Sequence, residues 1–147
     1  MKLKHLKHTD TLDFFAVDED VFSTIPMFSD AVQAGFPSPA EDHMDMDLNL
    51  NDHLVQNPSA TFCVKAIGES MKDAGIQSGD IMIVDKSLEP KNRSIVLAVI
   101  DGEFTVKRVN INDKKLYLMP ENSNFSPIKI TEDMDFKVWG VVTYIIH

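Results

Sequence analysis

A serine and a lysine, 37 residues apart, are the residues of this chain best suited to covalent chemistry. Ser70 lies in the run Gly68-Glu69-Ser70-Met71, and Lys107 lies near the end of the run Gly102–Arg108. A serine hydroxyl becomes a good nucleophile only when a base removes its proton, and a lysine can be that base only when burial lowers its pKa. Gly68 permits a tight turn, so the hydroxyl and nearby backbone N–H groups can face one substrate. The pattern therefore predicts a Ser-Lys hydrolase.

The same two residues also have a non-catalytic interpretation. Most serines are turn or cap residues, and most lysines are solvated surface charges. Strand alternation places Lys107 and Arg108 on opposite faces and does not choose between them. Arginine cannot lose its proton at accessible pH, so the chemistry selects Lys107 as the base. The alternative from another functional class is a protein-interaction module in which Ser70 is a turn residue and Lys107 a surface charge.

Short motifs between about Ile25 and Tyr144 have the order and spacing of one protein family. They are Phe28-Ser29-Asp30, Gly35–Ala40, Pro58–Thr61, Gly68–Met71, Gly75–Asp80 and Asp101–Lys107. Together they resemble the LexA/UmuD family of self-cleaving serine proteins, peptidase family S24, and its UmuD branch most. The first twenty or so residues show no such resemblance.

The resemblance implies a role for each residue of the site. Ser70 corresponds to the nucleophile and Lys107 to the base, and the backbone N–H groups of Glu69 and Ser70 would stabilise the oxyanion. The family cuts itself at a small residue followed by glycine, which places the cleaved bond between Ala34 and Gly35. A bond that enters a narrow cleft is best flanked by residues with little or no side chain.

The resemblance also implies a biological setting. Proteins of this kind act in the bacterial DNA-damage (SOS) response as homodimers, and a RecA filament on single-stranded DNA stimulates their self-cleavage. The shortened dimer would then be a subunit of an error-prone translesion polymerase, with a UmuC-like Y-family polymerase as partner and no cofactor. A LexA-like repressor fragment is the alternative within the family. It would require a helix-turn-helix before the cleavage site, for which 34 acidic-leaning residues are few.

Charge, cysteine content and hydropathy limit the classes of binding partner and the cellular compartment that we expect. The net charge of −9 would repel a phosphate backbone, so we expect no direct high-affinity binding to nucleic acid. The single cysteine, Cys63, excludes an intramolecular disulfide and suits a reducing cytoplasm, where we expect a small buried side chain. No apolar run approaches the ~18 residues of a membrane span, so we expect a cytoplasmic protein without membrane attachment.

Metal binding is not expected. The acidic run Asp45–Leu50 lacks the glycine and glutamate that a calcium loop needs at its sixth and twelfth positions. His5 and His8 have no further ligands near them in the sequence. Trp139, within an apolar run, is interpreted as a core or dimer-interface residue.

The elements that must position the site divide the chain near residue 40. Residues 1–40 show no sustained strand period and are interpreted as a flexible, extended N-terminal arm that contains the cleavage site. Residues 41–147 are predicted to form a β-rich catalytic and dimerisation domain, so the fold class is mainly β, a compact antiparallel domain of the LexA/UmuD C-terminal type. A short helix should begin near Asn49 or Asn51, and a helical turn should cover Ser70–Ala74. The predicted strands are Thr61–Ile67, Ile81–Asp85, Ile95–Asp101, Glu103–Val109, Lys115–Met119, Ile128–Ile130 and Phe136–Ile146.

Overall fold

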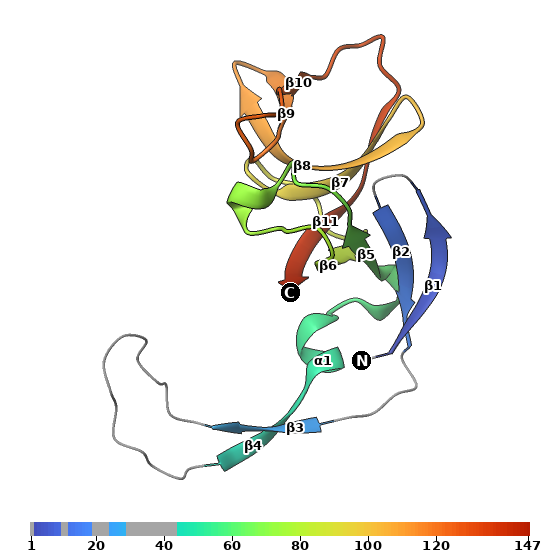
Figure 1. The fold of residues 1–147 in the computed structure, drawn as a ribbon, viewed down its shortest axis with the longest axis vertical. Helices are drawn as coiled ribbons and strands as arrows, with labels where there is room; N and C mark the ends of the chain where they lie inside the picture. The colour runs from blue at the N-terminus through green and yellow to red at the C-terminus, as the bar shows by residue number, and fades with distance from the viewer. Residues whose placement is uncertain (1, 10–11, 19–23, 29–43) are drawn as a thin grey trace, which may run out of the picture.

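The structure, a computed structural model, describes residues 2–9, 12–18, 24–28 and 44–147 (Figure 1). It is mainly antiparallel β, which confirms the predicted fold class, and each strand predicted after residue 60 is present. The predicted bounds hold within one residue except in β8, which continues to Asn112. The strands are β1 (Leu3–His8), β2 (Leu12–Val17), β3 (Thr24–Phe28), β4 (Met44–Asn49), β5 (Thr61–Ala66), β6 (Ile81–Asp85), β7 (Ile95–Ile100), β8 (Glu103–Asn112), β9 (Lys115–Met119), β10 (Ile128–Lys129) and β11 (Phe136–Ile146).

One large sheet organises the fold. Its nine strands run in the order β1-β2-β5-β6-β11-β7-β8-β9-β10, and the long β11 pairs with β7 through its first half and with β6 through its second. Gly140 lies where β11 passes from one partner to the other. A Cβ there would come within 2.6 Å of Val84 Cγ1 and 3.0 Å of the Asp85 carbonyl oxygen, so the crossing requires glycine. The sheet curls strongly beyond this point, as Figure 1 shows for β7 to β10.

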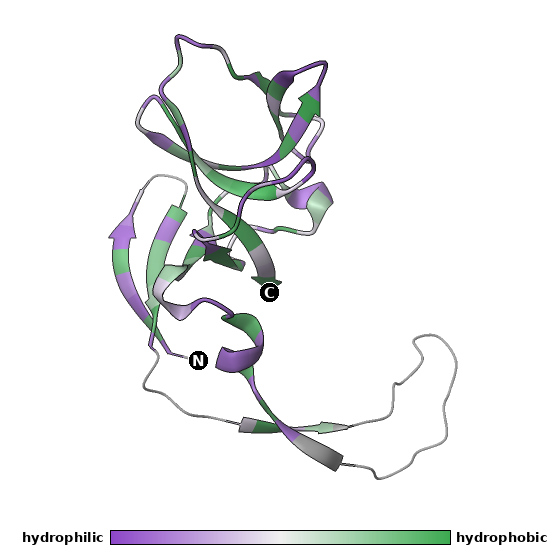
Figure 2. Ribbon diagram, turned by 180° about the vertical axis from the view of Figure 1, so that it is seen from behind, coloured by the Kyte–Doolittle hydropathy of each residue, from purple (hydrophilic) through white to green (hydrophobic). Residues whose placement is uncertain are grey.

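The curled sheet encloses two apolar clusters. One lies around β2, β5, β6, β7 and β8 and includes Val64, Met82 and Leu97, and the other lies between β7, β8 and β9 and includes Val96 and Leu118. Figure 2 shows hydrophobic residues as green segments along the strands of the sheet. The functional residues described below lie at the edge of the first cluster.

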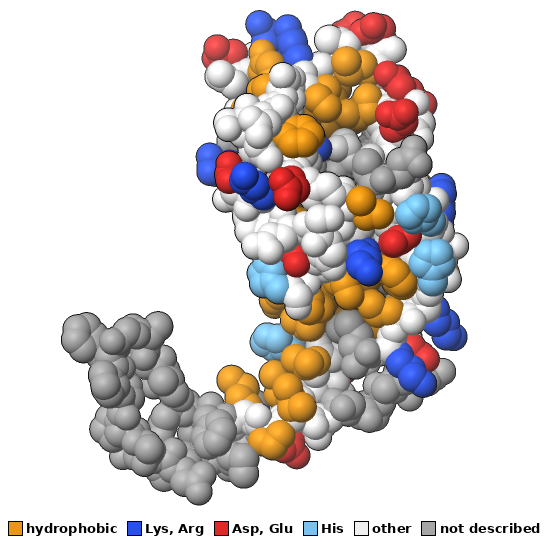
Figure 3. Space-filling view, viewed as in Figure 1, with side chains coloured by type: hydrophobic (Ala, Val, Ile, Leu, Met, Phe, Trp, Pro, Cys, Tyr) orange, Lys and Arg blue, Asp and Glu red, His pale blue; other side chains and the backbone are white. Residues whose placement is uncertain are grey.

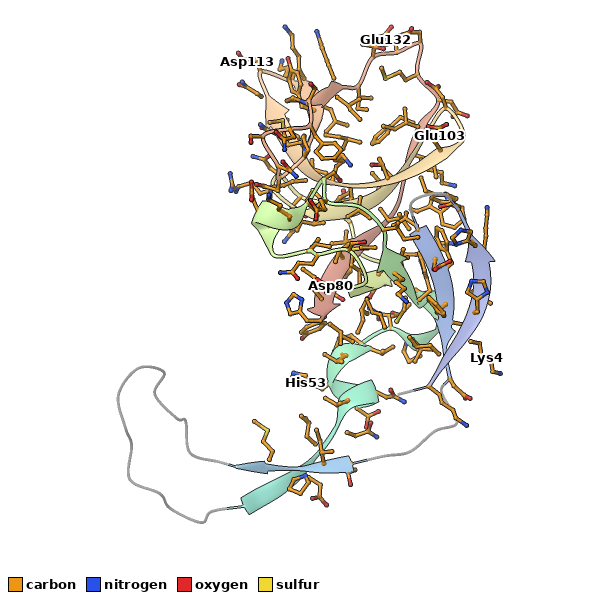
Figure 4. The ribbon with its side chains drawn as sticks, in the orientation of Figure 1. Lys4, His53, Asp80, Glu103, Asp113 and Glu132 are labelled. Carbon is orange, nitrogen blue, oxygen red and sulfur yellow. The ribbon has the colours of Figure 1, made fainter. Side chains whose placement is uncertain are left out.

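The N-terminal segment differs from the expectation of an arm without strand period. β1 and β2 form a hairpin, and β2 continues the large sheet by pairing with β5. The strand period of β2 is real, because Leu12 and Phe14 are buried, but Phe15 and Val17 on the other face conceal the alternation. β1 is an edge strand with exposed polar residues such as Lys4, which projects outward in Figure 4, so it carries no apolar period.

A two-stranded sheet lies apart from the nine-stranded sheet in the strand pairing. β3 pairs with β4, and the predicted short helix follows as α1 (Leu50–Leu54). The Asn49 side chain caps this helix by accepting hydrogen bonds from the N–H groups of Asn51 and Asp52, as the start near Asn49 predicted. Ala34 and Gly35 lie between β3 and β4, outside the described residues. Within the described ranges, no helix is long and apolar enough to cross a membrane.

Candidate active site

Ser70 lies in the turn that joins β5 to the short helix η2 (Lys72–Ala74), so the helical turn predicted over Ser70–Ala74 is present but begins two residues later. The chain leaves β5 through Gly68, whose φ of +102° lies in the region that favours glycine. The turn at residues 77–80 supports the segment around Gly68, because the N–H of Gly68 donates to Ser78 Oγ at 3.2 Å. Asp80 stabilises this turn by accepting a hydrogen bond from the N–H of Gln77. Figure 4 shows Asp80 beside the C-terminal end of β11.

Lys107 reaches Ser70 from the middle of β8. Its Nζ lies 3.0 Å from Ser70 Oγ, 2.8 Å from Thr105 Oγ1 and 3.0 Å from the carbonyl oxygen of Val106. The residue is only 9% exposed, whereas Arg108 on the opposite face forms an ion pair with Glu121. The structure therefore brings together the serine and the lysine that the sequence selected.

Burial shifts the pKa of this lysine. Desolvation lowers the pKa of Lys107 below its ordinary value of 10.5, because the charged ammonium loses more hydration than the neutral amine. No carboxylate lies among the three hydrogen-bond partners of Nζ to stabilise the charged form. A neutral amine has two N–H donors and one lone pair, which these three oxygens can satisfy when Ser70 is the donor.

A cleft of about 220 Å³ opens beside this pair. Its lining is mainly apolar, with Ser70, Lys107 and Thr105 as polar groups on one wall. An apolar lining of this kind favours apolar groups of a ligand and limits the access of water to the amine. The residues that line it are Leu12, Ala66, Ile67, Gly68, Glu69, Ser70, Met71, Ile76, Met82, Phe104, Thr105, Val106, Lys107 and Phe125.

The segment after β9 orients the peptide units next to Ser70. The buried Asn122 donates from Nδ2 to the carbonyl oxygen of Glu69 at 2.8 Å, and the N–H of Glu121 donates to the carbonyl oxygen of Ser70 at 2.8 Å. In a trans peptide the N–H points opposite to the C=O of the same peptide unit. The two contacts therefore direct the N–H groups of Ser70 and Met71 away from the segment after β9. Within the described residues, the N–H groups of Glu69 and Ser70 donate no hydrogen bond.

Two residues of this arrangement were missed by the sequence analysis. Thr105 shares a strand face with Lys107 and lies two residues before it, which was a usable signal. Asn122 was missed because nothing in its neighbourhood along the chain indicates a contact with Glu69, 53 residues away.

Other predicted residues are placed as follows. Cys63 is fully buried, which confirms the expected small buried side chain, and desolvation raises its pKa to about 11. Trp139 packs edge-on against Phe104 with ring centroids 4.9 Å apart, as a core residue. Lys65 and Lys72 are exposed. Within the described ranges, no group of three or more His, Cys, Asp or Glu side chains could hold a metal ion.

Comparisons with known proteins show the family of the chain. The family described as Peptidase S24-like matches residues 26–143, a range that includes the serine and the lysine. Protein SamA of Salmonella typhimurium is 46% identical over 129 residues, which cover 88% of this chain and 89% of SamA. Protein ImpA of Escherichia coli is 42% identical over 122 residues, or 83% of each chain. Protein MucA of Escherichia coli is also 42% identical over 122 residues, which cover 82% of this chain and 83% of MucA.

Proposed function

The chain belongs to the peptidase S24-like family, and we propose that it is a serine endopeptidase that cuts itself between Ala34 and Gly35. Ser70 Oγ attacks the carbonyl carbon of Ala34 while the neutral amine of Lys107 takes the hydroxyl proton. Lys107 then gives that proton to the departing amine of Gly35, which leaves an acyl-enzyme on Ser70. Water hydrolyses the acyl-enzyme, with Lys107 again acting as the base.

The contact between Ser70 Oγ and Lys107 Nζ at 3.0 Å is the observation that carries this proposal. A hydroxyl and an amine at this distance can exchange a proton directly. The lowered pKa of Lys107 increases the fraction of neutral amine, which is the form that the mechanism needs. A surface lysine beside a turn serine would have neither the burial nor the set of three oxygen partners.

Backbone N–H groups would stabilise the negative oxygen that forms during attack. We assign this role to Glu69 and Ser70, whose N–H groups donate to no other described residue. The hydrogen bond from Asn122 supports the assignment for Ser70, because the Glu69 carbonyl that it holds belongs to the same peptide unit as the Ser70 N–H. That peptide unit is thus oriented before the substrate arrives.

The biological role follows from the family resemblance. We infer that the protein is a homodimer of the SOS response, whose cut is stimulated by a RecA filament on single-stranded DNA. The shortened dimer would join a UmuC-like Y-family polymerase in error-prone lesion bypass. Because substrate and catalyst belong to one chain or one dimer, each site cuts once. A filament would act by favouring the state in which the N-terminal arm is docked with Ala34 and Gly35 against Ser70, and it would supply no catalytic group.

Mass spectrometry of the purified protein at pH 7 to 11 tests the proposal. We expect fragments that end at Ala34 and begin at Gly35, and a first-order rate that rises with pH to a midpoint below 10.5, because the pKa of Lys107 is lowered. Ser70→Ala should abolish the cut without changing the melting temperature much. Cutting at this bond in Ser70→Ala, or a rate that does not depend on pH, would refute the mechanism.

A further inference from the structure

The N-terminal hairpin β1–β2 is bound to the rest of the protein by more than the chain that follows it. β2 pairs with β5 over five residue pairs, from Leu12 opposite Ala66 to Ala16 opposite Phe62. Leu12 and Phe14 are 3% and 5% exposed, and both belong to the first apolar cluster. Burying two large apolar side chains and a row of strand hydrogen bonds is a substantial docking interaction.

Aromatic contacts strengthen this interface. The ring of Phe14 stacks on Phe62 with centroids 6.1 Å apart and meets Phe104 edge-on at 4.8 Å. Lys7 Nζ lies 5.1 Å from the centroid of the Phe104 ring on the hairpin side. Apart from the hairpin, these contacts involve only residues of β5 and β8, which lie well after residue 43.

The hairpin is also closed by its own hydrogen bonds. The N–H of Asp18 donates to the carbonyl oxygen of Lys2 at one end, and the N–H of Thr9 donates to that of Leu12 at the other. On its outer side, His8 Nδ1 lies 2.5 Å from Asp13 Oδ1. Figure 3 shows histidine side chains gathered on the right of the molecule, over the hairpin. These hydrogen bonds that close the hairpin all lie within residues 2–18.

These contacts join residues before the bond that the proposed function cuts to residues after it, and cutting one peptide bond breaks none of them. We propose that the fragment 1–34 stays bound after cleavage as a separate chain, with β2 still paired to β5. Release of the fragment is then a second step, distinct from the cut. The inference rests on the proposed function only for the position of the cut.

Retention has a consequence for the catalytic cleft. Leu12 lines the cleft beside Ser70 and Lys107, so the hairpin supplies part of its wall. A bound fragment keeps that wall in place after cleavage. Its release would uncover the β5 edge and the Phe62 and Phe104 rings, an apolar strip suited to an added β-strand.

The test cuts the chain without using its own chemistry. A full-length Ser70→Ala variant with a site for an added specific protease placed within residues 29–43 is cut completely and then passed over a size-exclusion column at low micromolar concentration. We expect the N-terminal fragment to co-elute with the remainder in native buffer and to separate in denaturant. Separate elution in native buffer would overturn the inference, whether or not the parent protein cleaves itself.

Variants in the same hairpin locate the interaction. Leu12→Asp places a charge in the buried interface and should weaken fragment binding about tenfold or more. Leu6→Asp is the matched control, since Leu6 is 61% exposed, and it should leave binding unchanged. Equal retention in the two variants would refute the role of β2. If Leu12→Asp does not fold, hydrogen exchange of the cut Ser70→Ala protein decides instead: protection of amides 12–16 should persist after cutting, and its loss would count against the inference.

Discussion

Thr105→Val removes one of the three oxygens that hold the Lys107 amine and keeps the shape of the side chain. Thr105 Oγ1 lies 2.8 Å from Nζ, and its loss leaves Ser70 Oγ and the Val106 carbonyl oxygen as partners. In the neutral amine, the second N–H can then turn toward Ser70 Oγ. In a fraction of the molecules, the lone pair of Lys107 Nζ then no longer faces the hydroxyl proton of Ser70, and these molecules cannot start the reaction.

The expected magnitude follows from the value of one hydrogen bond. A neutral hydrogen bond contributes about 1 to 1.5 kcal/mol, which corresponds to a fall of about five- to fifteen-fold in the plateau rate of self-cleavage. The charged ammonium loses a stronger bond than the neutral amine, so the pKa of Lys107 should move further down. The midpoint of the pH profile should therefore shift to lower pH while the plateau falls.

The assay is the first-order loss of intact chain, followed by mass spectrometry at pH 7 to 11. Thr61→Val is the matched control, because Thr61 is also half-buried and its Oγ1 donates to the Asn57 carbonyl oxygen at 2.7 Å, remote from the site. It should lower the melting temperature and leave the pH profile unchanged. An unchanged profile in Thr105→Val, or an equal fall in Thr61→Val, would refute the assignment of Thr105 as a positioning residue.

Three further predictions concern the buried amine, the loop contact and the sheet crossing. In a Ser70→Ala background, Lys107→Met should raise the free energy of unfolding at neutral pH, where the buried ammonium is unfavourable. The advantage should shrink as pH rises from the lowered pKa toward 10.5, and denaturant titrations at several pH values would measure it. Asn122→Ala removes the donor to the Glu69 carbonyl and should slow self-cleavage about tenfold, with no shift in the midpoint of the pH profile; an unchanged rate would contradict the positioning role. Gly140→Ala places a Cβ 2.6 Å from Val84 Cγ1 and should lower the free energy of unfolding by about 1 to 3 kcal/mol in a urea titration. A smaller loss than about 0.5 kcal/mol would mean that the crossing can relax.

Local patterns in the sequence determined the fold class and most strand positions. The signals that predict turns and strands each span only a few residues, as in the turn at Asp101-Gly102 and the strand Ile81–Asp85. They can be recognised without knowing which strands pair. The selection of Lys107 over Arg108 also needed no structure, because only lysine can lose its proton.

The hairpin β1–β2 shows where local patterns were insufficient. An edge strand such as β1 needs no buried face, and β2 has apolar residues on both faces, so neither has a clean alternation of two. That β2 pairs with β5, more than 45 residues later, depends on the apolar cluster around Val64 that the rest of the sheet assembles. Pairing between distant strands is a property of the folded sheet.

The site itself was decided by tertiary structure. Three strands, β6, β11 and β7, separate β5 from β8 in the sheet order, so only the curling of the sheet brings Lys107 to within 3.0 Å of Ser70. The same curl buries the amine and lowers its pKa, and it brings Asn122 to the Glu69 carbonyl. The sequence determined which side chains could do the chemistry. Their distance, their burial and their supporting hydrogen bonds arise from packing between segments far apart in the chain, which no local pattern encodes.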